Sequence, residues 1–359
     1  MFIKKLRLVK KLIGRFALGN KNLILFSLGR TLKPKWIWFG VTDNCNSHCT
    51  HCNIWQKNPT QNQLTLKEIE KTLSDPLFDK VETIINSGGE AILRPDIIEI
   101  IKLEHKLFPK ASLDLSTNGI LADRALNVIK DILNENIKIN IGVSLDAPDK
   151  KHDEIRGVPG NFEKVNYLLH ELVKLREKYP KKLSIVIGLT LSDLTIDGWE
   201  QVKEYADKLN IDMMAQWYNQ SSFYDNENKN NEINKDKMTD AVKKQPNTII
   251  REKWLKLLKS QSIKFRCFAA QTFLVLRCDG NKVPYLSYWD LIMGNVREQS
   301  PSEIWHNNKA KEIRKTIAKC PGCLNSWGVE WSMTTAFYPR LFFYLRNPKA
   351  VLDRLKRRD

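Results

Sequence analysis

The sequence predicts an α/β fold built on a parallel sheet, either doubly wound or closed into a barrel. From about residue 37 to residue 217, short apolar runs alternate with segments whose apolar residues recur every three or four positions. The runs have the length and β-branched content of strands, whereas the segments have the periodicity of amphipathic helices. Such strand–helix alternation with short connections is typical of parallel sheets. Polar motifs also follow successive strands, at the edge where barrels place their chemistry.

Each element rests on its own local pattern. Strands are expected over 37–41, 81–86, 112–116, 139–145, 183–191 and 211–217. Helices are expected over 95–107, 121–134, 162–178 and 195–209. A further helix is expected after Thr65, because Glu68 three positions later completes a capping box.

The composition is that of a globular chain. Its 359 residues are 42% hydrophobic and 28% charged, which is ample for a packed core. Five regions are expected: a basic extension with a helix (1–36), the alternating core (37–217), a polar loop and linker helix (218–261), a small α+β module that carries cysteines (262–330) and an aromatic, basic tail (331–359). Within the module, Asp279-Gly280 predicts a hairpin turn between strands 273–276 and 283–286.

Basic residues concentrate at the two ends of the chain. The formal net charge is +17, and residues 1–42 contain neither Asp nor Glu. The helix expected over 2–16 has an apolar face and a basic face, so it could lie on an anionic membrane surface or pack on the protein body. With no signal peptide and no apolar run of membrane-spanning length, we expect a cytoplasmic protein, for which a peripheral contact with the inner membrane face is the alternative to a freely diffusing one.

The cysteines are unevenly distributed. Cys45, Cys49 and Cys52 lie together after the first strand, and Cys267, Cys278, Cys320 and Cys323 follow much later. Such clustering in a chain without a signal peptide indicates metal binding rather than disulfides. Three thiolates on one loop can hold three corners of a four-iron cluster and leave the fourth iron open. The alternative is a structural zinc site with His48 or His51 as fourth ligand.

Polar motifs follow the next three strands. Ser87-Gly88-Gly89-Glu90 follows the second strand, Ser116-Thr117-Asn118-Gly119 ends the third, and Ser144-Leu145-Asp146 ends the fourth. The glycines permit a close backbone approach, and Glu90 can accept hydrogen bonds from an ammonium group. Each motif also has an ordinary structural explanation as a turn or a helix cap, but their common position favours one shared site.

In combination, these motifs resemble the radical S-adenosylmethionine (radical SAM) superfamily over about residues 37–217. The resemblance implies a partial (β/α)6 TIM-like barrel with a [4Fe-4S] cluster. The open iron would bind the amine and carboxylate of S-adenosylmethionine. One electron, from a flavodoxin- or ferredoxin-type donor, would cleave the sulfonium to methionine and a 5′-deoxyadenosyl radical that takes hydrogen from a substrate.

The resemblance also assigns roles by position. Cys45, Cys49 and Cys52 would be the cluster ligands. Gly88, Gly89 and Glu90 would hold the methionine amine. Ser116, Asn118, Ser144 and Asp146 would face the ribose or carboxylate, Arg156 would bind the carboxylate, and His51 would lie near adenine. A plain surface arginine in a loop that leads into a helix remains the alternative for Arg156.

The C-terminal cysteines resemble a degenerate SPASM/twitch extension, a region that binds auxiliary clusters. Tyr285 stands where the family usually has a cysteine, and no cysteine follows Cys323. Cys267, Cys320 and Cys323 could hold one auxiliary iron–sulfur cluster, Cys278 could complete it, or the thiols could bind zinc or simply pack.

The substrate cannot be identified from the sequence. We expect an oxidoreductase-like enzyme that acts on a small molecule, with a sugar and a lipid-linked compound as the two candidates. The alternative is an enzyme that matures a ribosomal peptide. A non-enzymatic zinc protein that binds nucleic acid is the hypothesis from another class. It is disfavoured because the basic residues lie at the chain ends, away from the cysteines.

Overall fold

The computed structural model describes residues 24, 30–57, 60–228, 234–245, 248–260, 267–320, 326–336, 343 and 346–347. The chain divides into two compact units. The barrel unit comprises residues 33–233 and 273–313, and the second unit comprises residues 1–32, 234–272 and 314–359. The helix expected over 2–16, most of the basic tail and Cys323 lie outside the described residues.

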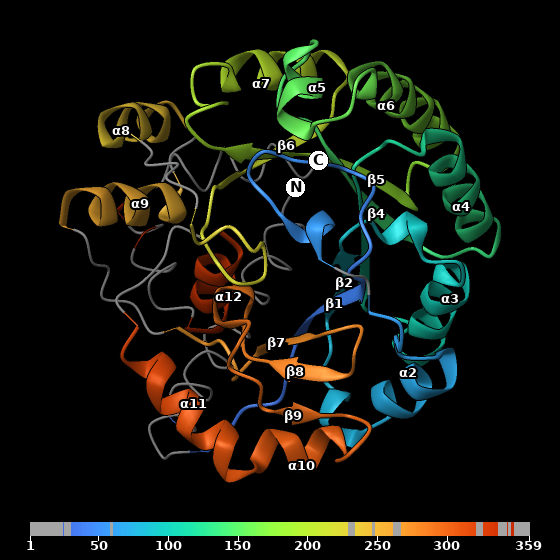
Figure 1. Ribbon diagram of the computed structural model, residues 1–359, viewed down its shortest axis with the longest axis vertical. Coiled ribbons are helices and arrows are strands. Elements are labelled where there is room, and N and C mark those ends of the chain that lie inside the picture. Colours follow the sequence, from blue (N-terminus) through green and yellow to red (C-terminus); the bar gives the residue numbers. More distant parts are fainter. Residues whose placement is uncertain are drawn as a thin grey trace, which may run out of the picture. The chain divides into compact units, whose positions relative to one another are not determined.

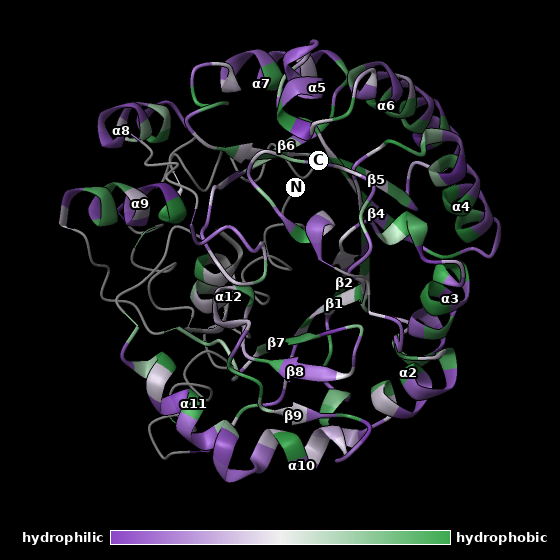
Figure 2. Cartoon of the chain, viewed as in Figure 1, coloured by the Kyte–Doolittle hydropathy of each residue, from purple (hydrophilic) through white to green (hydrophobic). Residues whose placement is uncertain are grey.

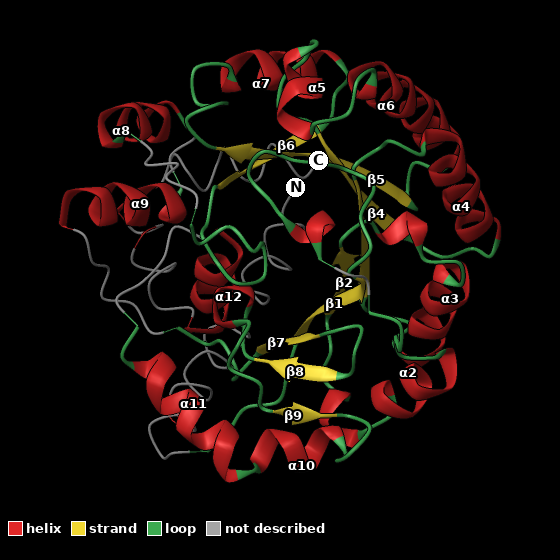
Figure 3. Ribbon diagram, viewed as in Figure 1, coloured by secondary structure: helices red, strands yellow, loops and turns green. Residues whose placement is uncertain are grey.

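One mixed sheet forms the frame of the barrel unit (Figures 1 and 3). Its strands are β1 (Trp36–Thr42), β2 (Thr83–Gly88), β3 (Ser112–Thr117), β4 (Ile139–Ser144), β5 (Leu183–Leu191), β6 (Asp212–Trp217), β7 (Phe273–Leu276), β8 (Asn281–Val283) and β9 (Gly294–Asn295). The order is β6-β5-β4-β3-β2-β1-β7-β8-β9. Strands β1 to β6 pair in parallel with their sequence neighbours, so the expected partial barrel is confirmed.

The sheet continues past β1 into the cysteine-bearing region. Strand β7 pairs in parallel with β1, and β8 and β9 extend the sheet with antiparallel pairs. The contacts of these strands group them with the barrel unit, and the module over 262–330 stays a prediction. The second strand of the hairpin ends at Val283, earlier than expected, because Pro284 has no N–H to continue the ladder.

Helices cover one face of this sheet (Figure 1). The barrel unit contains α2 (Leu66–Leu73), α3 (Ile97–Leu107), α4 (Ala122–Asn134), α5 (Lys151–Arg156), α6 (Asn161–Lys178), α7 (Trp199–Lys208) and α10 (Pro301–His306), and α11 (Asn308–Ala318) runs from it into the second unit. The capping box at Thr65 and Glu68 starts α2 as expected. In Figure 2 the larger helices carry hydrophobic residues toward the strands and hydrophilic residues away from them.

Alternation along the strands separates a packing face from an inner face. In β4, Ile139, Ile141 and Val143 are buried. The alternate residues Gly142 and Ser144 are half-buried. Successive side chains of a strand point to opposite faces, so the apolar set packs under the helices. On the inner face, Ser116 lies opposite Gly142 and Ser144 lies opposite Gly188. Small side chains therefore occupy the inner face near the carboxyl ends of these strands.

The described part of the second unit is mostly helical. It contains α8 (Lys235–Lys244), α9 (Ile249–Ser260) and α12 (Ser326–Ala336). Its apolar core brings together Ile249, Val329, Met333 and Phe343. Helix α8 was not expected, because its short apolar stripe of Met238, Ala241 and Val242 lies in a strongly polar stretch.

Candidate functional site: the cysteine loop after β1

The candidate ligands lie on one loop that leaves the carboxyl end of β1, hereafter the cysteine loop (residues 43–53). Cys49 is buried, and Cys45 and Cys52 are half-buried. Each sulfur has a hydrogen-bond donor close by. The backbone N–H groups of Ser47 and Ile54 serve Cys45 and Cys52. The Cys49 Sγ lies 3.1 Å from Ser47 Oγ and 3.7 Å from Arg156 Nη1. The loop therefore presents three thiols in a hydrogen-bonded setting.

Burial holds two of these thiols in the protonated form. It raises the pKa of Cys45 to about 11 and that of Cys52 to about 12, and the charges of the neighbouring cysteines act in the same direction. Because the thiolate is the metal ligand, binding of a metal group by this loop would release protons.

The Gly-Gly-Glu segment after β2 pairs with the cysteine loop. Gly89 N donates to Thr42 O at 2.8 Å, and Glu90 N donates to Asn44 O at 2.8 Å. A Cβ on Gly88 would lie 2.0 Å from Thr42 O, and one on Gly89 would lie 2.2 Å from Asn44 O. The glycines are thus needed to bring this backbone against the loop that carries the cysteines.

Glu90 ties this segment to the end of β3. Its fully buried carboxylate accepts hydrogen bonds from Ile92 N at 3.1 Å and from Asn118 N at 2.6 Å. Burial raises the pKa of Glu90, and these hydrogen bonds oppose the rise. The expected partner of this carboxylate was an ammonium group, whereas its partners in the protein itself are the backbone amides of Ile92 and Asn118 and the Thr117 side chain.

Asn118 extends the same connection to the cysteine loop. Its Nδ2 donates to Asn46 Oδ1 at 2.8 Å, and its Oδ1 accepts from Ile120 N at 3.0 Å. Ser116 and Ser144 lie on the inner face of the sheet and are half-buried. The ends of β1, β2 and β3 are therefore linked by polar contacts that converge on one loop.

Helix α5 supports the other side of the loop. His48 N donates to Arg156 O at 2.9 Å, and Thr50 N donates to Ile155 O at 2.8 Å. Gly157 ends the helix with φ +63°, and a Cβ there would lie 2.5 Å from His48 O. The sequence predicts a loop here, because a helix of six residues has too little periodicity to be recognised.

A buried ion pair lies behind Cys49. Arg156 Nε donates to Asp146 Oδ2 at 2.6 Å, with side-chain exposures of 9% and 0%. Asp146 Oδ1 accepts from Thr190 N at 3.0 Å. Although burial opposes it, the charge of Arg156 lowers the pKa of Asp146. We expected Asp146 to face the cofactor, whereas in the structure its carboxylate holds Arg156 and the end of β5.

His152 completes this arrangement in its neutral form. Asp146 N donates to His152 Nδ1 at 3.1 Å. Burial lowers the pKa of His152 to about 4, and the charge of Arg156 adds to the effect. At neutral pH, the imidazole therefore accepts this backbone hydrogen bond and fixes the turn that carries Asp146.

Residues 218–228, which were expected to be a polar surface loop, pack on the cysteine loop. Asn53 N donates to Tyr224 O at 2.7 Å, and Asn226 Nδ2 donates to His51 O at 2.9 Å. Phe223 packs edge-on against Trp38 of β1, with ring centroids 5.2 Å apart. The sequence signal that could have revealed this role is the Phe223-Tyr224 pair within an otherwise polar stretch.

His51 also lies in the protein body. It is 8% exposed, and its charge contributes to the low pKa of Asp146. Its position near adenine stays a prediction.

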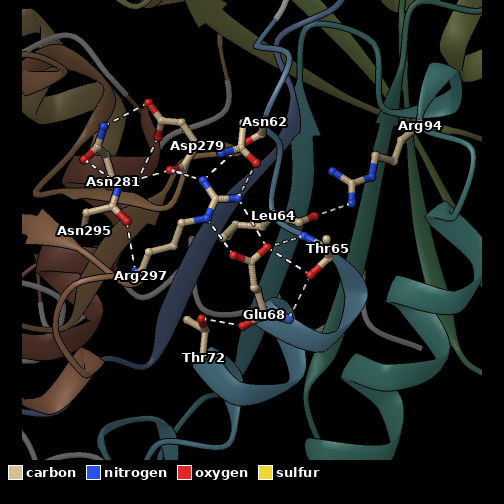
Figure 4. A network of polar contacts seen from close by, with 10 residues as sticks. All are labelled: Asn62, Leu64, Thr65, Glu68, Thr72, Arg94, Asp279, Asn281, Asn295 and Arg297. Carbon is tan, nitrogen blue, oxygen red and sulfur yellow. Dashed lines mark hydrogen bonds and ion pairs between the residues drawn. The ribbon is translucent and has the colours of Figure 1, made fainter.

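A second polar network fixes the segment that follows the cysteine loop (Figure 4). Arg297 donates to Glu68 at 2.6 Å and to Asn62 O at 3.1 Å. Arg94 Nη2 donates to Leu64 O at 2.6 Å, and its Nη1 donates to Val41 O at 2.9 Å. The start of α2 is thus anchored to β1 on one side and to the β9 region on the other.

The remaining cysteines divide between the two units. Cys278 is buried in the β7–β8 turn of the barrel unit, and its carbonyl accepts from Leu64 N at 2.7 Å. Burial raises the pKa of its thiol to about 12. Cys267 and Cys320 belong to the second unit, where burial raises the pKa of Cys267 to about 11 and the charge of Cys320 adds to it.

The donor set can be tested against the two metal groups considered above. Within the described part of the chain, no three His, Cys, Asp or Glu side chains converge closely enough to hold a single ion. An iron–sulfur cluster takes each thiolate at a different iron atom, so its ligands need not converge on one point. Three thiols on one loop, each with its own hydrogen-bond donor, fit such a cluster.

Comparison with family models gives two matches. Residues 40–210 match the radical SAM superfamily, and residues 267–324 match the SPASM iron–sulfur cluster-binding domain. Together, the two matches cover more than half of the chain and include all the residues of the predicted site.

Sequence relatives cover shorter stretches. The chain is 31% identical over 137 residues to pre-heme d1 synthase of Dinoroseobacter shibae, a match of 37% of this chain and 32% of that protein. It is 33% identical over 132 residues to the antilisterial bacteriocin subtilosin biosynthesis protein AlbA of Bacillus subtilis. This match covers 36% of this chain and 28% of that protein. The chain therefore spans about a third of the length of these two relatives.

Solved structures share the fold at low identity. Streptococcus suis SuiB bound to S-adenosylmethionine matches with a TM-score of 0.59 at 14% identity, covering 81% of this chain and 70% of that one. The protein anSMEcpe with bound AdoMet also matches with a TM-score of 0.59 at 17% identity, covering 89% of this chain and 98% of that one. The chain belongs to the radical SAM superfamily of enzymes, whose cofactors are a [4Fe-4S] cluster and S-adenosylmethionine, and it carries a SPASM region.

Proposed function

We propose that this protein cleaves S-adenosylmethionine reductively at a [4Fe-4S] cluster held by Cys45, Cys49 and Cys52, and that hydrogen abstraction from a substrate follows. One observation carries the proposal. The three cysteines lie on a single loop at the carboxyl end of β1, and the Gly-Gly-Glu segment of the neighbouring strand is hydrogen-bonded to that same loop. Parallel barrels place their catalytic groups at this edge.

The bound cluster would supply the electron that splits S-adenosylmethionine into methionine and a 5′-deoxyadenosyl radical. The chain's own residues position the reactants. The backbone of residues 88–90 lies against the cysteine loop, so groups bound to that loop would meet the Gly-Gly-Glu edge. Ser116 and Ser144 would offer hydroxyl groups from the inner face of β3 and β4.

Arg156 suits the carboxylate of the methionine moiety. Its Nε and Nη1 are directed at Asp146 and Cys49, and no described residue accepts a hydrogen bond from Nη2. A guanidinium is a planar donor fork that suits carboxylates, and its orientation here is fixed by the buried ion pair. We therefore assign Nη2 to the carboxylate.

The test is anaerobic reconstitution with iron and sulfide, followed by incubation with S-adenosylmethionine and dithionite. The proposal predicts methionine and 5′-deoxyadenosine by mass spectrometry, and no 5′-deoxyadenosine when dithionite is omitted. Protein that carries the cluster but releases no 5′-deoxyadenosine under reduction would contradict it.

Two substrate classes are open to test. A peptide substrate is supported by the likeness in fold to SuiB, whose structure bound to the precursor peptide SuiA matches with a TM-score of 0.56 at 15% identity. A small molecule remains our first expectation, and the candidates are a sugar and a lipid-linked compound. Candidate substrates of both classes, each with deuterium at a single position, would decide between them. The true substrate transfers its deuterium to 5′-deoxyadenosine, which mass spectrometry detects.

The electron donor and the membrane contact are further proposals. We propose a flavodoxin- or ferredoxin-type donor, testable by replacing dithionite with either protein.

None of the helices that the structure describes is long and apolar enough to cross a membrane. A peripheral contact through residues 1–20 is tested by sedimentation with anionic liposomes, where the full chain should bind and a chain without these residues should not.

A further inference from the structure

Of the three sulfurs on the cysteine loop, only that of Cys49 has a charged donor among the described residues. The donors of Cys45 and Cys52 are backbone N–H groups. Cys49 Sγ instead lies 3.7 Å from Arg156 Nη1, and Ser47 Oγ lies 3.1 Å from the same sulfur. The positive charge therefore acts on one ligand position.

The position of this guanidinium is set by contacts of both the side chain and the backbone of Arg156. Asp146 holds Nε at 2.6 Å, and Thr190 N holds the other oxygen of Asp146 at 3.0 Å. The Arg156 carbonyl also accepts from His48 N at 2.9 Å and from Ser47 Oγ at 3.1 Å, so the backbone of Arg156 is bonded to the loop that its side chain approaches. The charge cannot move away from Cys49 without breaking these contacts.

We propose that the buried Arg156–Asp146 pair is a positioning device that tunes the reduction potential of the catalytic [4Fe-4S] cluster through Cys49. The inference rests on the proposed function and extends it, because it gives Arg156 a role before S-adenosylmethionine binds.

The physical reason is electrostatic. One-electron reduction adds a negative charge that is shared with the ligand sulfurs, and hydrogen bonds to those sulfurs are among the factors that set the potential. A guanidinium held at Cys49 in a buried setting favours that added charge, and burial strengthens the interaction. Asp146 keeps the arginine in place, and its own negative charge moderates the effect.

The experiment measures the midpoint potential of the reconstituted protein by dithionite titration, followed by electron paramagnetic resonance, without S-adenosylmethionine. R156Q removes the charge, R156K retains it, and R297Q is the matched control. Arg297 is also ion-paired, to Glu68 at 2.6 Å, but contacts none of the three ligands. Working without S-adenosylmethionine separates the effect on the cluster from any loss of carboxylate binding.

We expect R156Q to lower the equilibrium constant for reduction at least about tenfold, which is about 59 mV for one electron. R156K should stay closer to the wild type than R156Q, and R297Q should match the wild type. Equal potentials in R156Q and the wild type would overturn the inference.

The loss of a buried partner could itself prevent assembly, because it leaves Asp146 as an uncompensated charge. The double variant D146N/R156Q removes both charges and is therefore measured alongside. A lowered potential in the double variant supports the proposal. Loss of iron from R156K, R156Q and the double variant alike would overturn it and assign the pair to holding the loop. A wild-type protein that assembles no [4Fe-4S] cluster would instead refute the proposed function.

Discussion

The cysteine loop and the cysteines of the second unit differ in how the chain holds them. On the loop, three cysteines lie within eight consecutive residues. Glu90 after β2, Asn118 after β3, helix α5 and residues 218–228 all donate to or accept from that loop. In the second unit, Cys267 and Cys320 come from segments far apart in sequence, and a Ser332 hydroxyl contacts the Cys267 thiol. A site built on one loop depends on the frame of the barrel, whereas a site built from distant segments depends on the packing of its own unit.

The largest effect should come from the ligands themselves. C49A is expected to abolish cleavage of S-adenosylmethionine, because a cluster held by only two thiolates has lost one corner of its ligand set. C267A/C320A should retain most of the cleavage, since these cysteines belong to the other unit. Release of 5′-deoxyadenosine by each reconstituted variant is the measurement. Equal loss in both variants would remove the functional distinction between the two regions.

The next effect concerns the contact between α5 and the cysteine loop. Gly157 and Gly160 have similar left-handed conformations, with φ +63° and +72°, but only Gly157 is crowded. G160A should cost about 1–2 kcal/mol for the left-handed backbone alone. G157A should cost about 1–3 kcal/mol more, because its Cβ would lie against His48 O.

Urea unfolding and iron content of both variants provide the comparison. G157A should also lose iron faster than G160A. Equal stability of the two would show that α5 does not fix the loop.

Much of this frame could be predicted from sequence, because it depends on local patterns. The six parallel strands, the capping box at Thr65 and the grouping of Cys45, Cys49 and Cys52 all follow from residues close together in the chain. The β1–β7 pairing could not be predicted, because a strand of four residues carries no signal for its neighbour in space. The contact of Asn226 with His51 O was missed for the same reason: a polar stretch looks alike whether it faces water or a carbonyl.

The segment that was taken for a surface loop offers a smaller test. N226D replaces an amide that donates to His51 O at 2.9 Å and to Asn219 O at 3.2 Å with a carboxylate that cannot donate. Asn226 is 1% exposed, so we expect a loss of about 1–3 kcal/mol and faster release of iron to a chelator. The control is N219D, a half-buried side chain that donates to Ser287 Oγ. If N226D behaves like N219D, residues 218–228 do not support the cysteine loop.

A test of pH dependence concerns the strand that delivers the Gly-Gly-Glu segment. Asn86 of β2 donates to the buried Glu104 of α3 at 2.8 Å, and burial raises the pKa of Glu104 to about 8. The folded state thus keeps a proton that the unfolded state loses above its ordinary pKa of 4.5. The free energy of unfolding should therefore fall as pH rises from about 5 to about 8, by up to ~1.4 kcal/mol per pH unit.

E104Q removes this titration, so its stability should depend less on pH than that of the wild type over this range. The control E99Q alters an exposed residue of the same helix and should leave the pH profile unchanged. Parallel pH profiles for E104Q and the wild type would contradict a protonated Glu104.

If the cysteine loop holds the catalytic cluster, the iron and sulfide content per chain must depend on its three cysteines. Wild-type protein and the variant C45A/C49A/C52A are reconstituted side by side. The triple substitution should remove about four irons and about four sulfides per chain, whatever the second unit retains. The same iron content in both proteins, or none in either, would contradict it, and bound zinc in their place would restore the zinc-site hypothesis.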